Sequence, residues 1–313
     1  MRFVLFAVLA AFFFIPAVLV ASDQDGVTAR SYILVEKESF RIVAGKDYHR
    51  RLHPASTTKV MTALIAVENL SGNETIVPNN HVSKIPPSKM NLVPGRRYKA
   101  IDIMKGALVR SANDAAYALA AHIAGSETAF ARIMTERARE IGAIDTNFQN
   151  ASGLPGENHY TTSYDLALIF RHALANEILV DLLSTKYFNF QDGTRRMRYQ
   201  NNNRLLFCFD PTICGKTGYT RLSRHCYVGA FEKDGKTYIL ALLGSENLWG
   251  DNVQILRTIY DRLPTDAQLR QARAANISIG STVSKPKSKK TVTRQTAVKH
   301  RAVKPKQPAI KKQ

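Results

Sequence analysis

Hydrophobic residues change their spacing several times along the 313-residue chain, and each change marks a different element. Two short apolar runs, at 31–36 and 40–45, are separated by the polar turn Lys-Glu-Ser and predict a pair of strands. After them, the apolar residues from Val60 to Val67 recur at helical spacing, with Pro54 just upstream. The first part of the chain therefore predicts two strands followed by a helix.

The middle of the chain has a helical pattern. Segment 101–125 indicates two helices that are interrupted near Ser111. Segment 126–142 begins with a serine cap and ends at a glycine, and segment 162–176 is another amphipathic helix. We therefore expect an all-helical subregion between two parts of a sheet.

From about residue 186 the pattern changes again. Alternating or continuous apolar runs predict strands within 186–201 and 225–244, with a hairpin turn at Asp234-Gly235. A helix over 247–263 closes the body. Strands, then helices, then strands and a helix indicate an α+β fold, in which an antiparallel sheet is flanked by helices, rather than a doubly wound parallel sheet.

The N-terminal segment differs from the body. Arg2 precedes an apolar run that ends near Val20 and is followed by small residues, which is the layout of a secretory signal peptide over residues 1–22. An uncleaved membrane anchor is the alternative, because the run is about long enough to span a bilayer. Either way, we expect export to the periplasm or cell-wall space, with a folded body over 28–263 and a connector over 264–280.

The net charge of +19 is unevenly distributed. Residues 281–313 contain eleven lysines and arginines and no acidic residue, so the rest of the chain carries the remaining +8. This segment is poor in large apolar residues, and we expect it to be a disordered basic tail. In an exported protein it suits anionic membranes or wall polymers, and no nucleic-acid partner is expected. A solvated tail without a specific partner is the alternative.

The three cysteines leave two possibilities open. Cys208 and Cys214 are close enough in sequence to bridge a loop in an oxidising compartment, or both can stay free. Cys226 follows His225, which raises the idea of a cysteine–histidine dyad. The surrounding sequence HCYVGAF reads as a central strand and argues against it.

The sequence PASTTK places a hydroxyl, Ser56, three residues before an amine, Lys59, at the start of the first predicted helix. Residues at i and i+3 share a helix face, so the two groups can meet. Serine becomes a nucleophile when a base removes its proton, and a lysine with a lowered pKa can be that base. Alone, this pattern also fits a serine that only caps the helix.

Two further polar clusters accompany it. Ser111 and Asn113 lie at the break between two helices, where a short turn can present a hydroxyl and an amide to a cleft. Lys216, Thr217 and Gly218 enter a predicted edge strand; the first two can bind a carboxylate, and the glycine lets a substrate backbone come close. Each cluster alone is a weak signal.

Together, in this order, the three clusters resemble the motif set of penicillin-binding proteins and serine β-lactamases, with alanine in the middle of the second motif. The segments PASTTKVMTA, VRSANDAAYALAAHIAGSE, NASGL and KTGYT are similar to the D-alanyl-D-alanine carboxypeptidases of serine peptidase family S11. The resemblance covers about residues 28–263. It implies a penicillin-binding protein-like fold and hydrolysis of peptidoglycan stem peptides, without a metal or cofactor.

The resemblance also implies roles for the first two motifs. Ser56 would form the acyl-enzyme, and Lys59 would be the base that activates it. Ser111 would pass a proton to the leaving D-alanine. Asn113 would hold the substrate amide and help to fix the lysine.

The third motif would bind the substrate. Lys216 and Thr217 would hold its terminal carboxylate, and the lysine charge would lower the pKa of the catalytic lysine. Gly218 would allow close approach. The backbone N–H of Tyr219 and that of the nucleophile would form the oxyanion hole. β-Lactams would acylate the same serine.

Some alternatives remain open at this stage. Arg221 and Arg224, just after the third motif, add charge that we expect near the cleft mouth. A D,D-endopeptidase that cuts peptidoglycan cross-links would use the same motifs. A β-lactamase is disfavoured because no E-x-x-L-N segment lies between the second and third motifs. A non-catalytic wall-binding protein would not need all three motifs intact.

Overall fold

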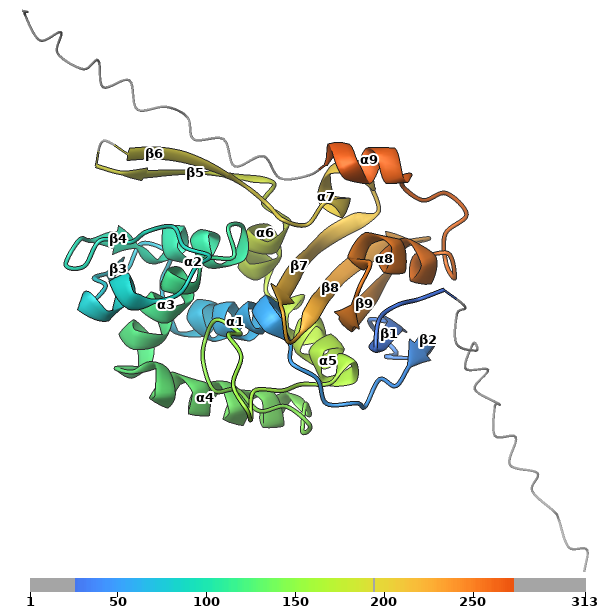
Figure 1. Cartoon of the computed structure of the whole chain (residues 1–313), viewed down its shortest axis with the longest axis horizontal. Coiled ribbons are helices and arrows are strands. Elements are labelled where there is room, and N and C mark those ends of the chain that lie inside the picture. The colour runs from blue at the N-terminus through green and yellow to red at the C-terminus, as the bar shows by residue number, and fades with distance from the viewer. Residues whose placement is uncertain (1–25, 194, 273–313) are drawn as a thin grey trace, which may run out of the picture. The chain divides into compact units, whose positions relative to one another are not determined.

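The computed structural model describes residues 26–193 and 195–272. A five-stranded antiparallel sheet with the strand order β2-β1-β9-β8-β7 lies at its centre (Figure 1). The strands are β1 (Ser31–Glu36), β2 (Ile42–Lys46), β7 (Thr212–Thr220), β8 (Arg224–Lys233) and β9 (Lys236–Ser245). The N-terminal strand pair therefore joins strands from the other end of the sequence, and β7 forms one edge.

Both faces of this sheet are buried, as the alternation along β1 shows. Ile33 and Val35 point into a large core shared with the helical region, whereas Tyr32 and Leu34 point into a smaller core on the opposite face. The smaller core receives apolar side chains from α8 (Leu248–Leu256) and α9 (Asp266–Gln271). The predicted α+β class, an antiparallel sheet with helices on both sides, is confirmed.

The helical subregion packs on the first face. It contains a short 3-10 turn, η1 (Ala55–Thr58), followed by α1 (Lys59–Asn69), which is buried over its first two turns. Around α1 lie α2 (Ala100–Leu108), α3 (Asn113–Ala124), α4 (Glu127–Ile141), α5 (Ser163–Ala173) and α6 (Glu177–Ser184). A short 3-10 turn, η2 (Asn80–Lys84), and the pair β3 (Thr75–Ile76) and β4 (Tyr98–Lys99) connect α1 to α2.

Several predicted boundaries agree with the structure. The break near Ser111 separates α2 from α3, the Ser126 hydroxyl accepts a hydrogen bond from the Ala129 N–H at 3.1 Å, and Gly142 ends α4 with a φ of 91°. The second strand begins two residues later than predicted, at Ile42.

Other elements differ from the expectation. The strands within 186–201, β5 (Tyr187–Asp192) and β6 (Arg195–Gln200), form a separate two-stranded ribbon instead of extending the main sheet. The predicted connector contains α9 over its first part. Helix α6 and the single turn α7 (Leu205–Cys208) were not predicted.

The three cysteines carry free thiols, so Cys208 and Cys214 are not bridged. Within residues 26–272, without 194, no helix is long and apolar enough to cross a membrane. The predicted signal peptide (1–22) and basic tail (281–313) lie outside the described residues.

Candidate active site

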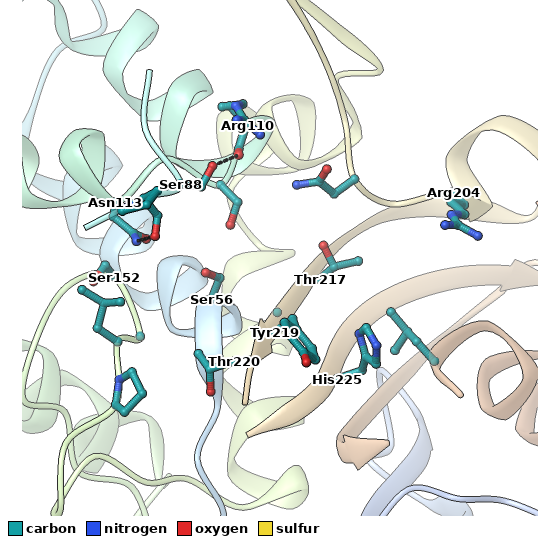
Figure 2. Close-up of a pocket in the computed structure, with 18 of the residues that line it drawn as sticks. Ser56, Ser88, Arg110, Asn113, Ser152, Arg204, Thr217, Tyr219, Thr220 and His225 are labelled. Atoms are coloured by element: carbon teal, nitrogen blue, oxygen red, sulfur yellow. Dashed lines mark hydrogen bonds between the residues drawn. The ribbon is translucent and has the colours of Figure 1, made fainter. Parts of the chain in front are cut away.

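The three predicted motifs meet in one cleft of about 680 Å³. Figure 2 shows Ser56 at its centre, between Asn113 and Ser152 on one side and Thr217 and Tyr219 of β7 on the other. The motifs come from the start of α1, the turn before α3 and the sheet edge. Motif residues as far apart in the sequence as Ser56 and Tyr219 thus line one cavity, because the fold brings these three elements together.

Ser56 does not cap the first helix. No side-chain cap hydrogen bond is made at the start of η1 or α1, and the Ser56 hydroxyl instead accepts a hydrogen bond from Lys59 Nζ at 2.9 Å. The preceding residue, Ala55, has a φ of 48°, a left-handed conformation that is costly for a residue with a side chain. The backbone is therefore strained where it presents the serine to the cleft.

Lys59 is fully buried and has three hydrogen-bond partners. Besides Ser56 Oγ, Nζ contacts Asn113 Oδ1 at 2.8 Å and the Ser152 carbonyl oxygen at 2.6 Å. Burial, and then the positive charge of Lys216, lower the pKa of Lys59 well below its ordinary value. A neutral amine within hydrogen-bond distance of a serine hydroxyl can act as a general base.

The second motif lies beside α1, at the turn before α3. Ser111 has a φ of 60°, and Asn113 is the first residue of α3. The Asn113 amide nitrogen donates to the carbonyl oxygens of Pro86 and Pro87 at 3.2 and 3.0 Å, which leaves its Oδ1 facing Lys59. The amide is thus held from both ends.

The third motif lies on β7. Lys216 is buried, and its Nζ donates to Ser111 Oγ at 3.0 Å and to the Thr217 carbonyl oxygen at 2.7 Å. Burial lowers the pKa of Lys216 to about 7. Thr217 and Tyr219 line the cleft, and a side chain on Gly218 would come within 2.8 Å of the Ser56 backbone nitrogen. All eight predicted site residues are therefore brought together.

Several cleft residues were not predicted. Ser152, Gly153 and Leu154 belong to the NASGL segment, which was noted only for its resemblance; its asparagine and glycine signal a tight turn but give no role. Arg110 and Arg204 also line the cleft, whereas Arg221 and Arg224 are not among its lining residues. The positive charge on the cleft lining therefore comes from Arg110, which directly precedes the second motif, and from Arg204.

Two further lining residues, His225 and Trp249, come from β8 and α8. Although His225 reaches the cleft, its neighbour Cys226 is buried, and burial raises the pKa of the Cys226 thiol to about 12. A thiol with such a pKa is not a thiolate at neutral pH, which argues against a cysteine–histidine dyad.

A buried lysine beside a serine at a helix start, a Ser-x-Asn turn and a Lys-Thr-Gly edge strand define a serine acyl-transfer enzyme of the penicillin-binding protein class. A family model described as D-alanyl-D-alanine carboxypeptidase matches residues 19–247. The chain belongs to this family, the serine peptidases of family S11, which confirms the resemblance stated from the motifs.

Individual proteins and a solved structure with the same family name are also similar to this chain. The chain is 33% identical over 217 residues to D-alanyl-D-alanine carboxypeptidase DacB2 of Mycobacterium tuberculosis, covering 69% of this chain and 74% of the relative. It is 28% identical over 276 residues to DacF of Bacillus subtilis, covering 82% and 71%. A crystal structure of a D-alanyl-D-alanine carboxypeptidase from M. tuberculosis superposes with a TM-score of 0.72 at 29% identity, covering 78% of this chain and 95% of that one.

Proposed function

We propose that the protein is a serine-type D-Ala-D-Ala carboxypeptidase that removes the terminal D-alanine from peptidoglycan stem pentapeptides through an acyl-enzyme on Ser56. The observation that carries this proposal is the contact between Lys59 Nζ and Ser56 Oγ at 2.9 Å, made by a fully buried lysine whose pKa is lowered. Family membership supports the same activity.

In the proposed acylation step, neutral Lys59 takes the proton of the Ser56 hydroxyl while the oxygen attacks the carbonyl carbon of the penultimate D-alanine. The backbone N–H groups of Ser56 and Tyr219 stabilise the oxyanion that forms. The close approach of β7 at Gly218 to the Ser56 nitrogen supports this pairing, because it brings the two backbone segments together.

The leaving D-alanine then needs a proton. Ser111 passes one from Lys59 to the departing amine as the peptide bond breaks. The hydrogen bond from Lys216 to Ser111 Oγ supports this role, since it fixes the position of the hydroxyl. Water next attacks the acyl-enzyme carbonyl while Lys59 takes its proton. The bond from the carbonyl carbon to Ser56 Oγ then breaks, the proton passes from Lys59 to Ser56 Oγ, and the shortened peptide leaves with a new carboxylate.

The leaving residue carries a carboxylate, which we assign to Lys216 and Thr217. The charge of the cleft supports this assignment. Its lining residues, all in the described part of the chain, include Arg110 and Arg204 but no aspartate or glutamate. A terminal carboxylate therefore enters a cationic site without meeting a like charge.

Mass spectrometry after penicillin treatment tests the nucleophile and the class together. We expect an adduct on the peptide that contains Ser56, and we expect Ser56→Ala to abolish both this adduct and pentapeptide hydrolysis. Ser83→Ala, at an exposed serine, is the matched control and should behave like the wild type. An adduct that survives in Ser56→Ala would overturn the assignment.

Assays with two different substrates distinguish carboxypeptidase activity from the cleavage of peptidoglycan cross-links. With a soluble pentapeptide, we expect release of one D-alanine per molecule, and with a cross-linked peptide dimer we expect slower or no cleavage. Preferential cleavage of the dimer would instead make the protein a D,D-endopeptidase. We place this activity outside the cytoplasmic membrane, on the basis of the signal-peptide pattern in residues 1–22.

A further inference from the structure

The turn formed by residues 150–154, called here the NASGL loop, provides the shortest hydrogen bond of the candidate base. The Ser152 carbonyl oxygen lies 2.6 Å from Lys59 Nζ, compared with 2.8 Å for Asn113 Oδ1 and 2.9 Å for Ser56 Oγ. A backbone carbonyl can only accept hydrogen bonds. It therefore contributes no proton and no charge, but it can determine how the lysine amine is oriented.

Orientation matters because a neutral amine has two N–H groups and one unshared electron pair in a roughly tetrahedral arrangement. Asn113 Oδ1 is also an acceptor, since its amide nitrogen already donates to Pro86 and Pro87. When Lys59 is neutral, its two N–H groups point to Asn113 and Ser152. The electron pair is then left facing the hydroxyl of Ser56, as a general base requires.

The position of the Ser152 carbonyl depends on the side chain of Asn150. Asn150 Oδ1 accepts hydrogen bonds from three successive backbone N–H groups, those of residues 152, 153 and 154, at 3.2, 2.8 and 3.0 Å, and from the Ser152 hydroxyl at 3.1 Å. Its amide nitrogen donates to the Leu154 carbonyl oxygen at 2.9 Å. One side chain thus replaces the hydrogen bonds that a helix or sheet would provide.

The rest of the NASGL loop is held from α1 and α4. The Thr62 hydroxyl donates to the Ala151 carbonyl oxygen at 2.6 Å, and the Ala151 N–H donates to Glu127 at 3.1 Å. Gly153 has a φ of 80°, and a side chain there would come within 1.8 Å of the Ala55 carbonyl oxygen. The loop therefore packs directly against the residue that precedes the nucleophile.

We propose that Asn150 is a positioning residue for catalysis: it holds the NASGL loop so that the Ser152 carbonyl directs the electron pair of Lys59 toward Ser56. This inference rests on the proposed roles of Ser56 and Lys59. It assigns to Asn150 an effect on the rate of acylation itself, in addition to any effect on stability.

The test is the rate of acylation by penicillin as a function of pH in Asn150→Ala, with Asn189→Ala as the control at an exposed position on β5. We expect the plateau rate of Asn150→Ala to fall about tenfold or more, because the amine loses its fixed orientation. We also expect the acidic limb to move to higher pH. An opened loop hydrates Lys59, and burial is the largest cause of its lowered pKa.

The conservative variant Asn150→Asp distinguishes an effect on the orientation of the Lys59 amine from an effect on the stability of the protein. A carboxylate accepts the same backbone hydrogen bonds, so we expect most of the plateau rate to return. The added negative charge favours the protonated lysine, so the acidic limb should stay shifted to higher pH. A purely structural asparagine would lower the melting temperature and leave the pH profile and plateau unchanged.

A folded Asn150→Ala protein whose plateau rate stays within about twofold of the wild type would overturn the inference. If this variant does not fold, Thr62→Val takes its place, because it releases the Ala151 carbonyl with little change of shape. Its plateau should fall about threefold or more, and an unchanged plateau would again overturn the inference. Absence of a penicillin adduct on Ser56 in the wild type would instead refute the proposed function.

Discussion

At the scale of single residues, the cleft is unusual in burying two lysines, Lys59 and Lys216. An isolated buried ammonium is costly, and proteins either pair it with an acid or let it lose its proton. No acid lines this cleft in the described part of the chain, and the pKa of both lysines is lowered by burial. Burial, together with the positive charge of Lys216, therefore favours the neutral form of Lys59, which is the state a general base needs.

A third buried basic residue, His159, leads to a prediction about stability. The ring accepts a hydrogen bond from the Gln149 N–H at Nδ1 and contacts Thr58 Oγ1 through Nε2 at 3.0 Å. Burial lowers its pKa from 6.5 to about 4. The unfolded chain therefore binds a proton between these pH values while the folded chain does not. The stability that His159 contributes is complete above pH 6.5 and is lost as the pH falls toward 4.

We therefore expect the free energy of unfolding of the wild type to fall more steeply with acidification than that of His159→Gln. Between pH 7.5 and 5 the difference in this fall should be on the order of 2 kcal/mol. Urea denaturation of both proteins at the two pH values measures it. Comparing the two proteins cancels the contributions of buried carboxyl groups, which act in the opposite direction. Equal falls in the two proteins would contradict the prediction.

At the scale of elements, β7 is positioned by its contact with η1. The two segments come close together at Gly218, where a side chain would lie 2.8 Å from the Ser56 nitrogen and 3.1 Å from the Pro54 carbonyl oxygen. Both neighbours are backbone atoms, which cannot rotate away. The spacing between the edge strand and the nucleophile is therefore set by the absence of a side chain.

We predict that Gly218→Ala keeps the fold but moves β7 away from η1. Acylation by penicillin should fall about a hundredfold, because a displacement of about 1 Å is enough to misalign the reacting groups. Gly72→Ala is the control, since its nearest neighbour would be at an ordinary contact distance of 3.6 Å. The rate of adduct formation and the circular dichroism spectrum are measured for the wild type and both variants. An unchanged acylation rate in Gly218→Ala would contradict the prediction, because it would show that a side chain fits between β7 and η1.

The elements also show how far the sequence alone could lead. Hydrophobic spacing was sufficient for β1, β9 and α4, because each has a buried face with a clear period. It could not separate the β5–β6 ribbon from the main sheet, because alternation reports a buried face and not the partner that buries it. Helix α9 is only six residues long and buries mainly Leu269, too little for a periodic signal.

The residues of the candidate site also fall into those that the sequence could predict and those that it could not. Ser56 and Lys59 could be predicted because they lie three residues apart in one short motif, and Lys216 because it begins the Lys-Thr-Gly motif. Arg204 and Trp249 could not, because they reach the cleft only through the packing of α7 and α8 on the sheet. The role inferred for Asn150 depends on hydrogen-bond distances, which no residue pattern contains.

At the scale of the whole molecule, charge is the property that the sequence distributes most unevenly. Residues 281–313 carry eleven of the 44 lysines and arginines and no acidic residue. The eight predicted site residues all lie upstream, within the described residues. We propose that the two parts have separate tasks, catalysis in the body and electrostatic attachment through the basic tail to anionic membrane lipids or wall polymers.

Deletion of the residues after Gly280 tests this division. We expect the shortened protein to bind vesicles rich in anionic lipid, or isolated walls, more weakly than the full chain does, while penicillin acylates both at the same rate. Full-chain binding should weaken with salt, because the Debye length falls from about 10 Å at 0.1 M to about 3 Å at 1 M. A full-length variant with all eleven basic residues changed to glutamine is the matched control for chain length, and it should bind as weakly as the deletion does. Binding that is the same with and without the tail would locate attachment in the body, whose own net charge is also positive.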